Sequence, residues 1–332
     1  MAAASRGAAT SLALIGGVAA VAYQDYASVF RNHRELRFYI LPTSYTYYLA
    51  RHYQALHKAE KAPFRILDNT PALADNMKHL PAKPVVLFVV GETARAMNFS
   101  LNGYERPTNP ELAQVPGLIN FTQATSCGTD TATSLPCMIS YDNRDHYDVN
   151  EARNKDNVLD ILQRAGYDVV WRDNNSGCKN MCDRVKIELK DVWADTRDCR
   201  DDHCFDTALL NRIRPLVASA RTGVVIALHM EGSHGPAYFE RSPAEFKAFA
   251  PECTTAQLQD CTAEQVTNAY DNSIRFTDHV LASAIRVLGS LGEGYAPALV
   301  YASDHGESLG RAGYTCTACP ISSHRTTSPG CR

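Results

Sequence analysis

The sequence predicts an α/β domain built on a largely parallel sheet. Four short apolar runs lack the alternation of half-buried strands, and polar residues follow each run at once: Pro84–Val90, Tyr167–Trp171, Gly223–Leu228 and Ala298–Ala302. Runs of this kind are typical of strands buried on both faces. Helical patterns lie between the runs, as in Asn157–Arg164 and Asn268–Leu291. This alternation of strands and helices favours a parallel sheet.

The N-terminal region differs from the rest of the chain. Ala8–Tyr23 is apolar and uncharged, but a bilayer-spanning helix needs roughly 20 apolar residues, so this stretch is marginal. It fits a signal-peptide core or the end of a membrane region, and we expect residues 1–24 to be a residual transmembrane or signal-like segment. Residues 25–80 begin with mixed aromatic and basic side chains, which suit a membrane-interface helix and linker. An ordinary amphipathic surface helix fits them equally well.

The domain proper is expected to begin near Pro81 and to cover residues 81–310. In open α/β sheets, ligands bind outside the carboxyl ends of the strands. The polar clusters that follow the four runs can therefore converge on one site, although a lone histidine after a strand is more often a hydrogen-bonded structural residue. These clusters are Gly91–Thr93, Arg172–Asn175, His229 with the following EGSHGP, and Ser303–His305.

Two carboxylates and an imidazole stand in these clusters, at Glu92, Asp304 and His305. Such oxygen and nitrogen ligands suit zinc better than manganese. The loop Ser126–Cys137 holds several hydroxyl groups, and one of them could act as a nucleophile once a base or a metal lowers its pKa. The alternative reading of that loop is a Ser/Thr-rich turn that caps a helix.

Composition limits the other possibilities. The chain has 332 residues and a formal net charge of −3, so no basic footprint for nucleic acid is present. Eleven cysteines are many for a cytosolic enzyme. Eight lie in close pairs that suit local disulfides in an oxidising compartment, whereas a metal-site reading needs convergent Cys and His at finger-like spacings. The pairs are Cys127 with Cys137, Cys178 with Cys182, Cys199 with Cys204, and Cys253 with Cys261.

Five motifs follow one another along the chain: GETARAMNFSLNGYERPTNPEL (91–112), SCGTDTATSLPCMIS (126–140), WRDNNSGCK (171–179), HMEGSHGPAYF (229–239) and SDHGES (303–308). Together they resemble the motifs of the phosphoethanolamine–lipid A transferases, and the resemblance runs from about Tyr23 to Gly310. These are inner-membrane enzymes with a periplasmic catalytic domain, and they include the mobile colistin-resistance enzymes. The resemblance implies the alkaline phosphatase and sulfatase fold, a three-layer α/β/α sandwich.

The resemblance also implies roles for individual residues. Thr131 would be the nucleophile and, with Glu92, Asp304 and His305, a zinc ligand; one zinc is expected and a second is left open. His234 would bind the transferred group with assistance from His229, and Asn175 and Lys179 would line the donor or acceptor pocket. The family's disulfides match the four cysteine pairs.

The implied reaction has two steps. Thr131 attacks phosphatidylethanolamine, diacylglycerol leaves, and a phosphate of lipid A takes phosphoethanolamine from the threonine. We expect a monomer in the bacterial inner membrane with a periplasmic catalytic domain, and a product that weakens polymyxin binding by lowering surface negative charge. Two alternatives remain: a hydrolase of the same superfamily (a sulfatase or phosphodiesterase), although CGTDTAT lacks the sulfatase Pro-x-Arg, and a non-catalytic fragment that binds zinc or anionic lipid.

The segment Arg311–Arg332 departs from the family pattern, which continues with a Leu-His-Gly-x-Pro segment whose histidine belongs to the active site. One codon choice for Thr315–Arg332, read in another frame, gives that segment. We therefore expect residues 311–332 to be an out-of-frame tail, in which Cys316 and Cys319 form neither a redox motif nor a zinc knuckle. The N-terminus holds only the last part of the family's membrane region, so truncation is expected at both ends.

Overall fold

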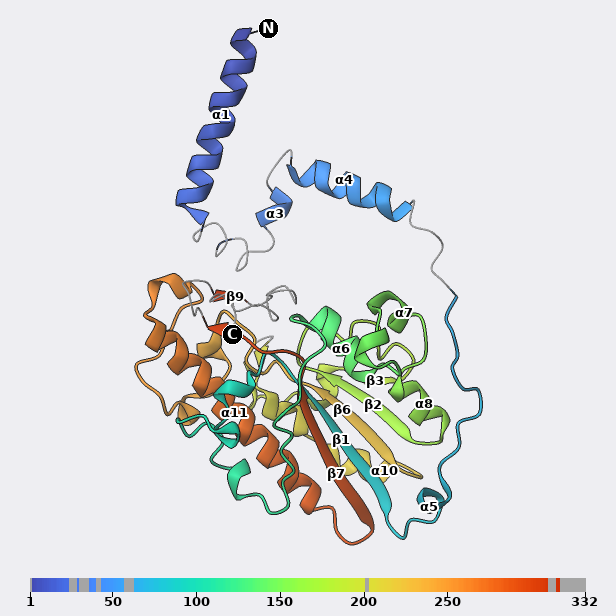
Figure 1. Ribbon diagram of the computed structural model, residues 1–332. Helices are drawn as coiled ribbons and strands as arrows, with labels where there is room; N and C mark the ends of the chain where they lie inside the picture. Colours follow the sequence, from blue (N-terminus) through green and yellow to red (C-terminus); the bar gives the residue numbers. More distant parts are fainter. Residues whose placement is uncertain are drawn as a thin grey trace. The chain divides into compact units, whose positions relative to one another are not determined.

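The structure is a computed structural model that describes residues 2–23, 29, 36–39, 43–56, 63–200, 203–309 and 315–316 (Figure 1). The chain divides into two compact units. Residues 1–61 with 255–261 form the smaller unit, and residues 62–254 with 262–332 form the larger unit. The predicted site residues all belong to the larger unit.

The described part of the smaller unit is helical. It contains α1 (Ala2–Val21), α3 (Leu36–Tyr39) and α4 (Thr43–Leu56). The alanine-rich composition of α1 favours a helix. Of the helices within the described residues, none combines the length and the apolar character that crossing a membrane requires.

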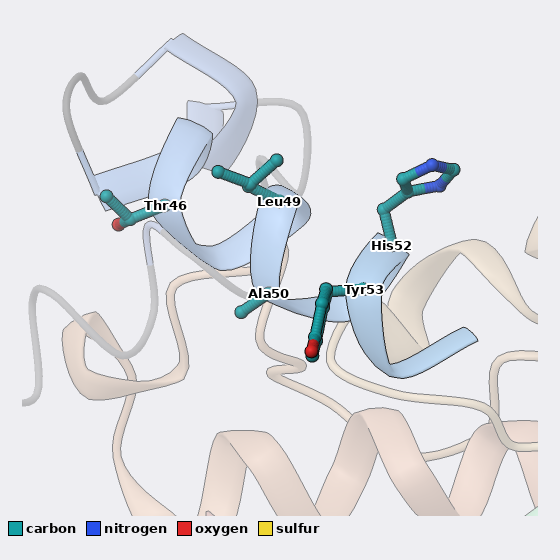
Figure 2. A pocket seen from close by; sticks show the side chains of 5 residues that line it. All are labelled: Thr46, Leu49, Ala50, His52 and Tyr53. Atoms are coloured by element: carbon teal, nitrogen blue, oxygen red, sulfur yellow. The ribbon is translucent and has the colours of Figure 1, made fainter. Parts of the chain in front are cut away.

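Helix α4 carries several exposed aromatic side chains. Tyr45 and Tyr53 are 65% and 64% exposed. A shallow pocket lies along this helix, as Figure 2 shows, and it contains none of the predicted catalytic residues. The expected interface role of this segment stays a prediction. The pocket is lined by Thr46, Leu49, Ala50, His52 and Tyr53.

The larger unit is built on a five-stranded sheet in the order β3-β2-β6-β1-β7, in which every pair of neighbours is parallel. The four apolar runs form four of these strands, as predicted, and β3 is an addition. The register sets their carboxyl ends side by side: Val90 pairs with His229, and Gly91 pairs with Ser303. The strands are β1 (Lys83–Gly91), β2 (Asp168–Asp173), β3 (Lys186–Glu188), β6 (Val224–His229) and β7 (Tyr295–Ser303).

Helices cover both faces of the sheet, which confirms the three-layer prediction (Figure 1). Val85, Leu87 and Val89 of β1 pack in one core with α10 (Ile213–Ser219) and α11 (Ala263–Gly289). Val86, Phe88 and Val90, which alternate with them, belong to a second core with α6 (Thr131–Ile139) and α8 (Val158–Arg164). Period-two alternation on a strand buried on both faces produces these two cores.

The predicted helices form with identifiable starts. Asn157 caps α8 in a capping box with Asp160. Helix α11 begins at Ala263, five residues before the predicted Asn268, because Thr262 and Gln265 form a second capping box. A capping box supplies hydrogen-bond partners to the first N–H groups of a helix, so the helix begins where the cap stands.

Three disulfides join residues of the larger unit: Cys127–Cys137, Cys178–Cys182 and Cys199–Cys204. Cys253 and Cys261 are each disulfide-bonded as well, and their mutual pairing stays a prediction. The first disulfide ties the loop before α6 to the body of that helix. The Cys199–Cys204 bridge joins the short antiparallel strands β4 (Cys199–Arg200) and β5 (His203–Cys204).

Short elements complete the larger unit. Ser308–Leu309 (β8) pairs with Thr315–Cys316 (β9), and the remainder of residues 310–332, including the out-of-frame prediction, lies outside the described residues. The other elements of the larger unit are α5 (Asp75–Lys78), α7 (Val149–Arg153), α9 (Lys190–Trp193), β4 (Cys199–Arg200), β5 (His203–Cys204) and 3-10 turns at Ala96–Asn98, Ser100–Asn102, Leu112–Gln114, Arg144–His146, Asp206–Leu210, Tyr238–Glu240 and Ala244–Phe246. A further 3-10 turn, Leu258–Asp260, belongs to the smaller unit.

Candidate active site

Two carboxylates and an imidazole meet beyond the carboxyl ends of β1 and β7. Glu92 follows β1, and Asp304 and His305 follow β7. One ligand atom from each of the three lies within 4.8 Å of the other two, and all three side chains are buried. His305 Nε2 is 3.3 Å from Glu92 Oε1 and 3.4 Å from Asp304 Oδ2. The parallel register of β1 and β7 brings these groups together.

Thr131 is the first residue of α6, and its hydroxyl reaches the same cluster. Asp130 caps the helix by accepting a hydrogen bond from the Thr133 N–H. Thr131 Oγ1 then donates to Glu92 Oε2 at 2.9 Å. The partial positive charge of a helix N-terminus favours negative charge that develops on this hydroxyl.

Asn175 approaches the cluster from the end of β2. Its Nδ2 donates to Glu92 Oε2 at 2.8 Å and to the Met230 carbonyl at 2.9 Å. The loop after β6 also contacts this point, because the Ser233 N–H donates to the Glu92 carbonyl at 3.0 Å. The four strand-end clusters of the sequence therefore lie around Glu92.

The pKa values of the cluster are shifted because two carboxylates and an imidazole are buried close together. Burial and the charge of Glu92 raise the pKa of Asp304 to about 6. Burial also opposes ionisation of Glu92 and His305, but their mutual hydrogen bond and charge outweigh it. The pKa of Glu92 is therefore lowered, and the pKa of His305 is raised to about 9. A buried pair of carboxylates demands a compensating cation.

The donor set fits a metal ion. Asp304 Oδ2 is buried and accepts no hydrogen bond from the described residues, although His305 Nε2 lies 3.4 Å away, so this ligand atom could accept a metal ion. Two carboxylates, an imidazole and a hydroxyl are ligands that zinc accepts. A second group, Cys178, Cys182 and Asp183, also lies within ligand distance, but its two sulfurs form a disulfide and cannot act as thiolate ligands.

The remaining predicted residues lie farther from the cluster or contact other groups. His229 is fully buried, and its Nδ1 is 2.9 Å from Asp173 Oδ2, while its Nε2 has no hydrogen-bond partner among the described residues. His234 is near enough for its charge to lower the pKa of Glu92. Lys179 is held by its own loop, because its Nζ donates to the carbonyl and hydroxyl of Ser176.

Sequence reasoning assigned no role to three residues that shape the site. Thr93 donates hydrogen bonds to Glu92 Oε1 and, through its N–H, to Asp304 Oδ1. Gly232 has φ +54°, and a Cβ there would stand 2.7 Å from the Glu92 carbonyl oxygen. Asp173 accepts the Asn175 N–H and orders the turn that carries it. All three residues lie inside motifs that indicated the site: GETAR, EGSHGP and WRDNN. Their individual roles could not be predicted, because they depend on hydrogen bonds and close contacts between segments that are distant in the sequence.

Two family models match the chain. The model described as sulfatase matches residues 84–326, and the model described as phosphoethanolamine transferase EptA/EptB matches residues 2–56. The first contains every predicted site residue.

Named relatives agree with these models. The phosphoethanolamine transferase EptA of Escherichia coli K12 is 41% identical over 91% of this chain and 55% of its own length. The phosphatidylethanolamine transferase Mcr-1 of Escherichia coli is 41% identical over 91% of this chain and 58% of its own length. The chain thus spans little more than half of these relatives. The soluble domain of lipooligosaccharide phosphoethanolamine transferase A from Neisseria meningitidis superposes with a TM-score of 0.71 at 38% identity, covering 79% of this chain and 78% of that one.

Proposed function

This chain belongs to the sulfatase family and, within it, to the phosphoethanolamine transferases, and on that premise we propose that it transfers phosphoethanolamine from phosphatidylethanolamine to a phosphate of lipid A. One observation carries the proposal. The Thr131 hydroxyl, at the N-terminus of α6, is hydrogen-bonded to Glu92 within a buried cluster of carboxylates and imidazole. A hydroxyl at such a site can act as a nucleophile.

The metal of this site would be zinc, held by Glu92, Thr131, Asp304 and His305. When bound, zinc would stabilise negative charge on the threonine oxygen and on the phosphoryl oxygens. Asn175 would keep Glu92 oriented, since its amide already donates to Glu92 Oε2. A second zinc stays open.

The transfer proceeds in two steps through a covalent threonine intermediate. Thr131 Oγ1 attacks the phosphorus of the donor, the bond from phosphorus to the diacylglycerol oxygen breaks, and diacylglycerol leaves carrying a proton in place of the one that Thr131 loses. A phosphate oxygen of lipid A then attacks the phosphorus of the phosphoethanolamine–threonine. The bond from phosphorus to Oγ1 breaks, and Oγ1 takes up the proton that the attacking phosphate hydroxyl releases.

Other residues would hold the transferred group. His234, whose charge already acts on Glu92, would contact the phosphoryl oxygens with help from His229, and Lys179 with Asn175 would line the donor or acceptor pocket. The enzyme would act at the bacterial inner membrane from the periplasmic side. The product adds an ammonium group to an anionic lipid, so polymyxin should bind the surface more weakly.

Peptide-mapping mass spectrometry tests the covalent step. The full chain is incubated with zinc and phosphatidylethanolamine and then digested without reduction, so that the same data report the disulfides. We expect a phosphoethanolamine adduct on Thr131 that Thr131→Ala abolishes. Thr133→Ala is the matched control, because Thr133 lies two residues further along α6 and its hydroxyl contacts Asp130 rather than Glu92. An adduct on another residue, or none, would contradict the proposal.

A hydrolase is the second candidate, because the larger matching family model is that of the sulfatases. In a hydrolase, water rather than lipid A would attack the threonine intermediate. Isolated adduct is therefore offered lipid A in labelled water. Modified lipid A identifies the transferase, and free labelled phosphoethanolamine in the presence of lipid A identifies the hydrolase.

A further inference from the structure

Thr93 adopts a backbone conformation that its side chain disfavours. Its φ is +55°, in the left-handed region where a β-branched residue is an outlier. The residue is fully buried and directly follows Glu92. Such strain persists only where the surroundings hold it in place, and it concentrates at functional sites.

The surroundings of Thr93 hold it through all of its polar groups. The hydroxyl donates to Glu92 Oε1, and the backbone N–H donates to Asp304 Oδ1 at 3.0 Å. One residue thus contacts both carboxylates of the cluster. The positive φ places its N–H and hydroxyl where they reach two acceptors that come from different strands.

Tyr270 completes the arrangement from helix α11. Its hydroxyl donates to the Thr93 carbonyl at 2.7 Å and accepts the Arg95 N–H at 2.8 Å. The tyrosine is fully buried. The loop after β1 is therefore fixed at residues 93 and 95 by one side chain of α11.

We propose that Thr93, locked by Tyr270, is a positioning residue that sets the two carboxylates Glu92 and Asp304 for metal binding. The inference rests on the zinc site of the proposed function. Hydrogen-bond partners of metal ligands fix the orientation of those ligands, and their loss typically weakens metal affinity about 10- to 100-fold. Thr93 acts through Glu92 and Asp304 and has no part in the reacting atoms.

Zinc affinity of the full chain tests the inference without any activity assay. Metal is removed with a chelator, and zinc is titrated against a chromophoric competitor. Thr93→Val keeps the shape and loses the hydroxyl, and we expect zinc to bind about 10- to 100-fold more weakly. Thr93→Ser keeps the hydroxyl and should stay within about threefold of the wild type. Tyr270→Phe should also weaken zinc binding, since it releases the Thr93 carbonyl.

Tyr301→Phe is the matched control. Tyr301 is also a tyrosine beside the cluster, but its hydroxyl has no hydrogen-bond partner among the described residues, so zinc affinity should not change. Thermal unfolding of each metal-free variant separates a folding defect from a loss of affinity, and Tyr270→Phe keeps the inference testable should Thr93→Val not fold. If Thr93→Val and Tyr270→Phe both bind zinc as tightly as the wild type, the inference is overturned and the proposed function is not affected. A wild type that binds no zinc overturns the proposed function and the inference with it.

Discussion

Asp173 collects four hydrogen bonds at the end of β2. Its Oδ2 accepts from Trp171 Nε1 and pairs with His229 Nδ1, and its Oδ1 accepts the N–H groups of Asn175 and Gly177. Burial opposes ionisation, but the hydrogen bond and charge of His229 with the other donors lower the pKa of Asp173 to about 2. The carboxylate is thus ionised in the folded state and holds the turn that presents Asn175.

This lowered pKa predicts a pH-dependent contribution to stability. Because the folded-state pKa lies below the unfolded value, the contribution is present above about pH 4 and is lost as the pH falls through about 2. Asp173→Asn should reduce the free energy of unfolding at pH 7 by about 2 kcal/mol and flatten its acid dependence. Urea unfolding between pH 7 and pH 2 measures this, with Asp168→Asn, an exposed carboxylate on the same strand, as control. Equal acid dependence in wild type and Asp173→Asn would contradict the assignment.

Gly232 gives a second prediction about a single residue. An alanine there would strain a φ of +54° and drive its Cβ to 2.7 Å from the Glu92 carbonyl. Gly177 has φ +86° with open space around it. Gly177→Ala should therefore cost only the left-handed backbone penalty, about 1–2 kcal/mol, whereas Gly232→Ala should cost more and also displace Glu92. Thermal unfolding together with zinc titration separates the two, and unchanged zinc affinity in Gly232→Ala would count against the close contact.

Among the elements, α11 depends on its cap. The Thr262 hydroxyl accepts the Gln265 N–H at 3.2 Å, and the Gln265 side chain accepts the Thr262 N–H at 2.8 Å. Thr262→Ala should lower the free energy of unfolding by about 1 kcal/mol without changing zinc affinity. Thr267→Ala in the same helix, where the exposed hydroxyl bonds to the Ala263 carbonyl, should be neutral or stabilising because alanine is the better helix former. Denaturant unfolding compares the two variants. An equal loss of unfolding free energy in both would show that the cap does not cause the loss in Thr262→Ala.

The elements also show what a sequence can and cannot reveal. Uninterrupted apolar runs predicted the four strands β1, β2, β6 and β7, since a strand buried on both faces must be apolar throughout. The residues after those strands predicted the cluster at Glu92, Asp304 and His305. The conformation of Thr93 could not be predicted from the sequence, because it is held by hydrogen bonds with Tyr270 and Asp304, which are far away in the chain. Strand β3 was missed because three residues carry too little periodicity.

At the scale of the whole molecule, the proposed zinc site joins elements that are distant in sequence. Its ligands would come from the ends of β1 and β7 and from the start of α6. An ion that binds only the folded arrangement stabilises it by linkage, by about 2.7 kcal/mol when free zinc is 100 times the dissociation constant. Zinc should therefore raise the thermal midpoint of the larger unit, and a chelator should reverse the shift.

Two asparagine variants test which carboxylate binds the zinc that raises the thermal midpoint. Asp304 Oδ2 is a buried carboxylate oxygen that accepts no hydrogen bond from the described residues, so Asp304→Asn should abolish the zinc-dependent shift. Asp183 is exposed and lies beside the Cys178–Cys182 disulfide, so Asp183→Asn should leave the shift intact. Differential scanning calorimetry with and without zinc compares the variants. A shift that survives Asp304→Asn and disappears in Asp183→Asn would place the ion at the disulfide loop, and the metal would then have no access to Thr131.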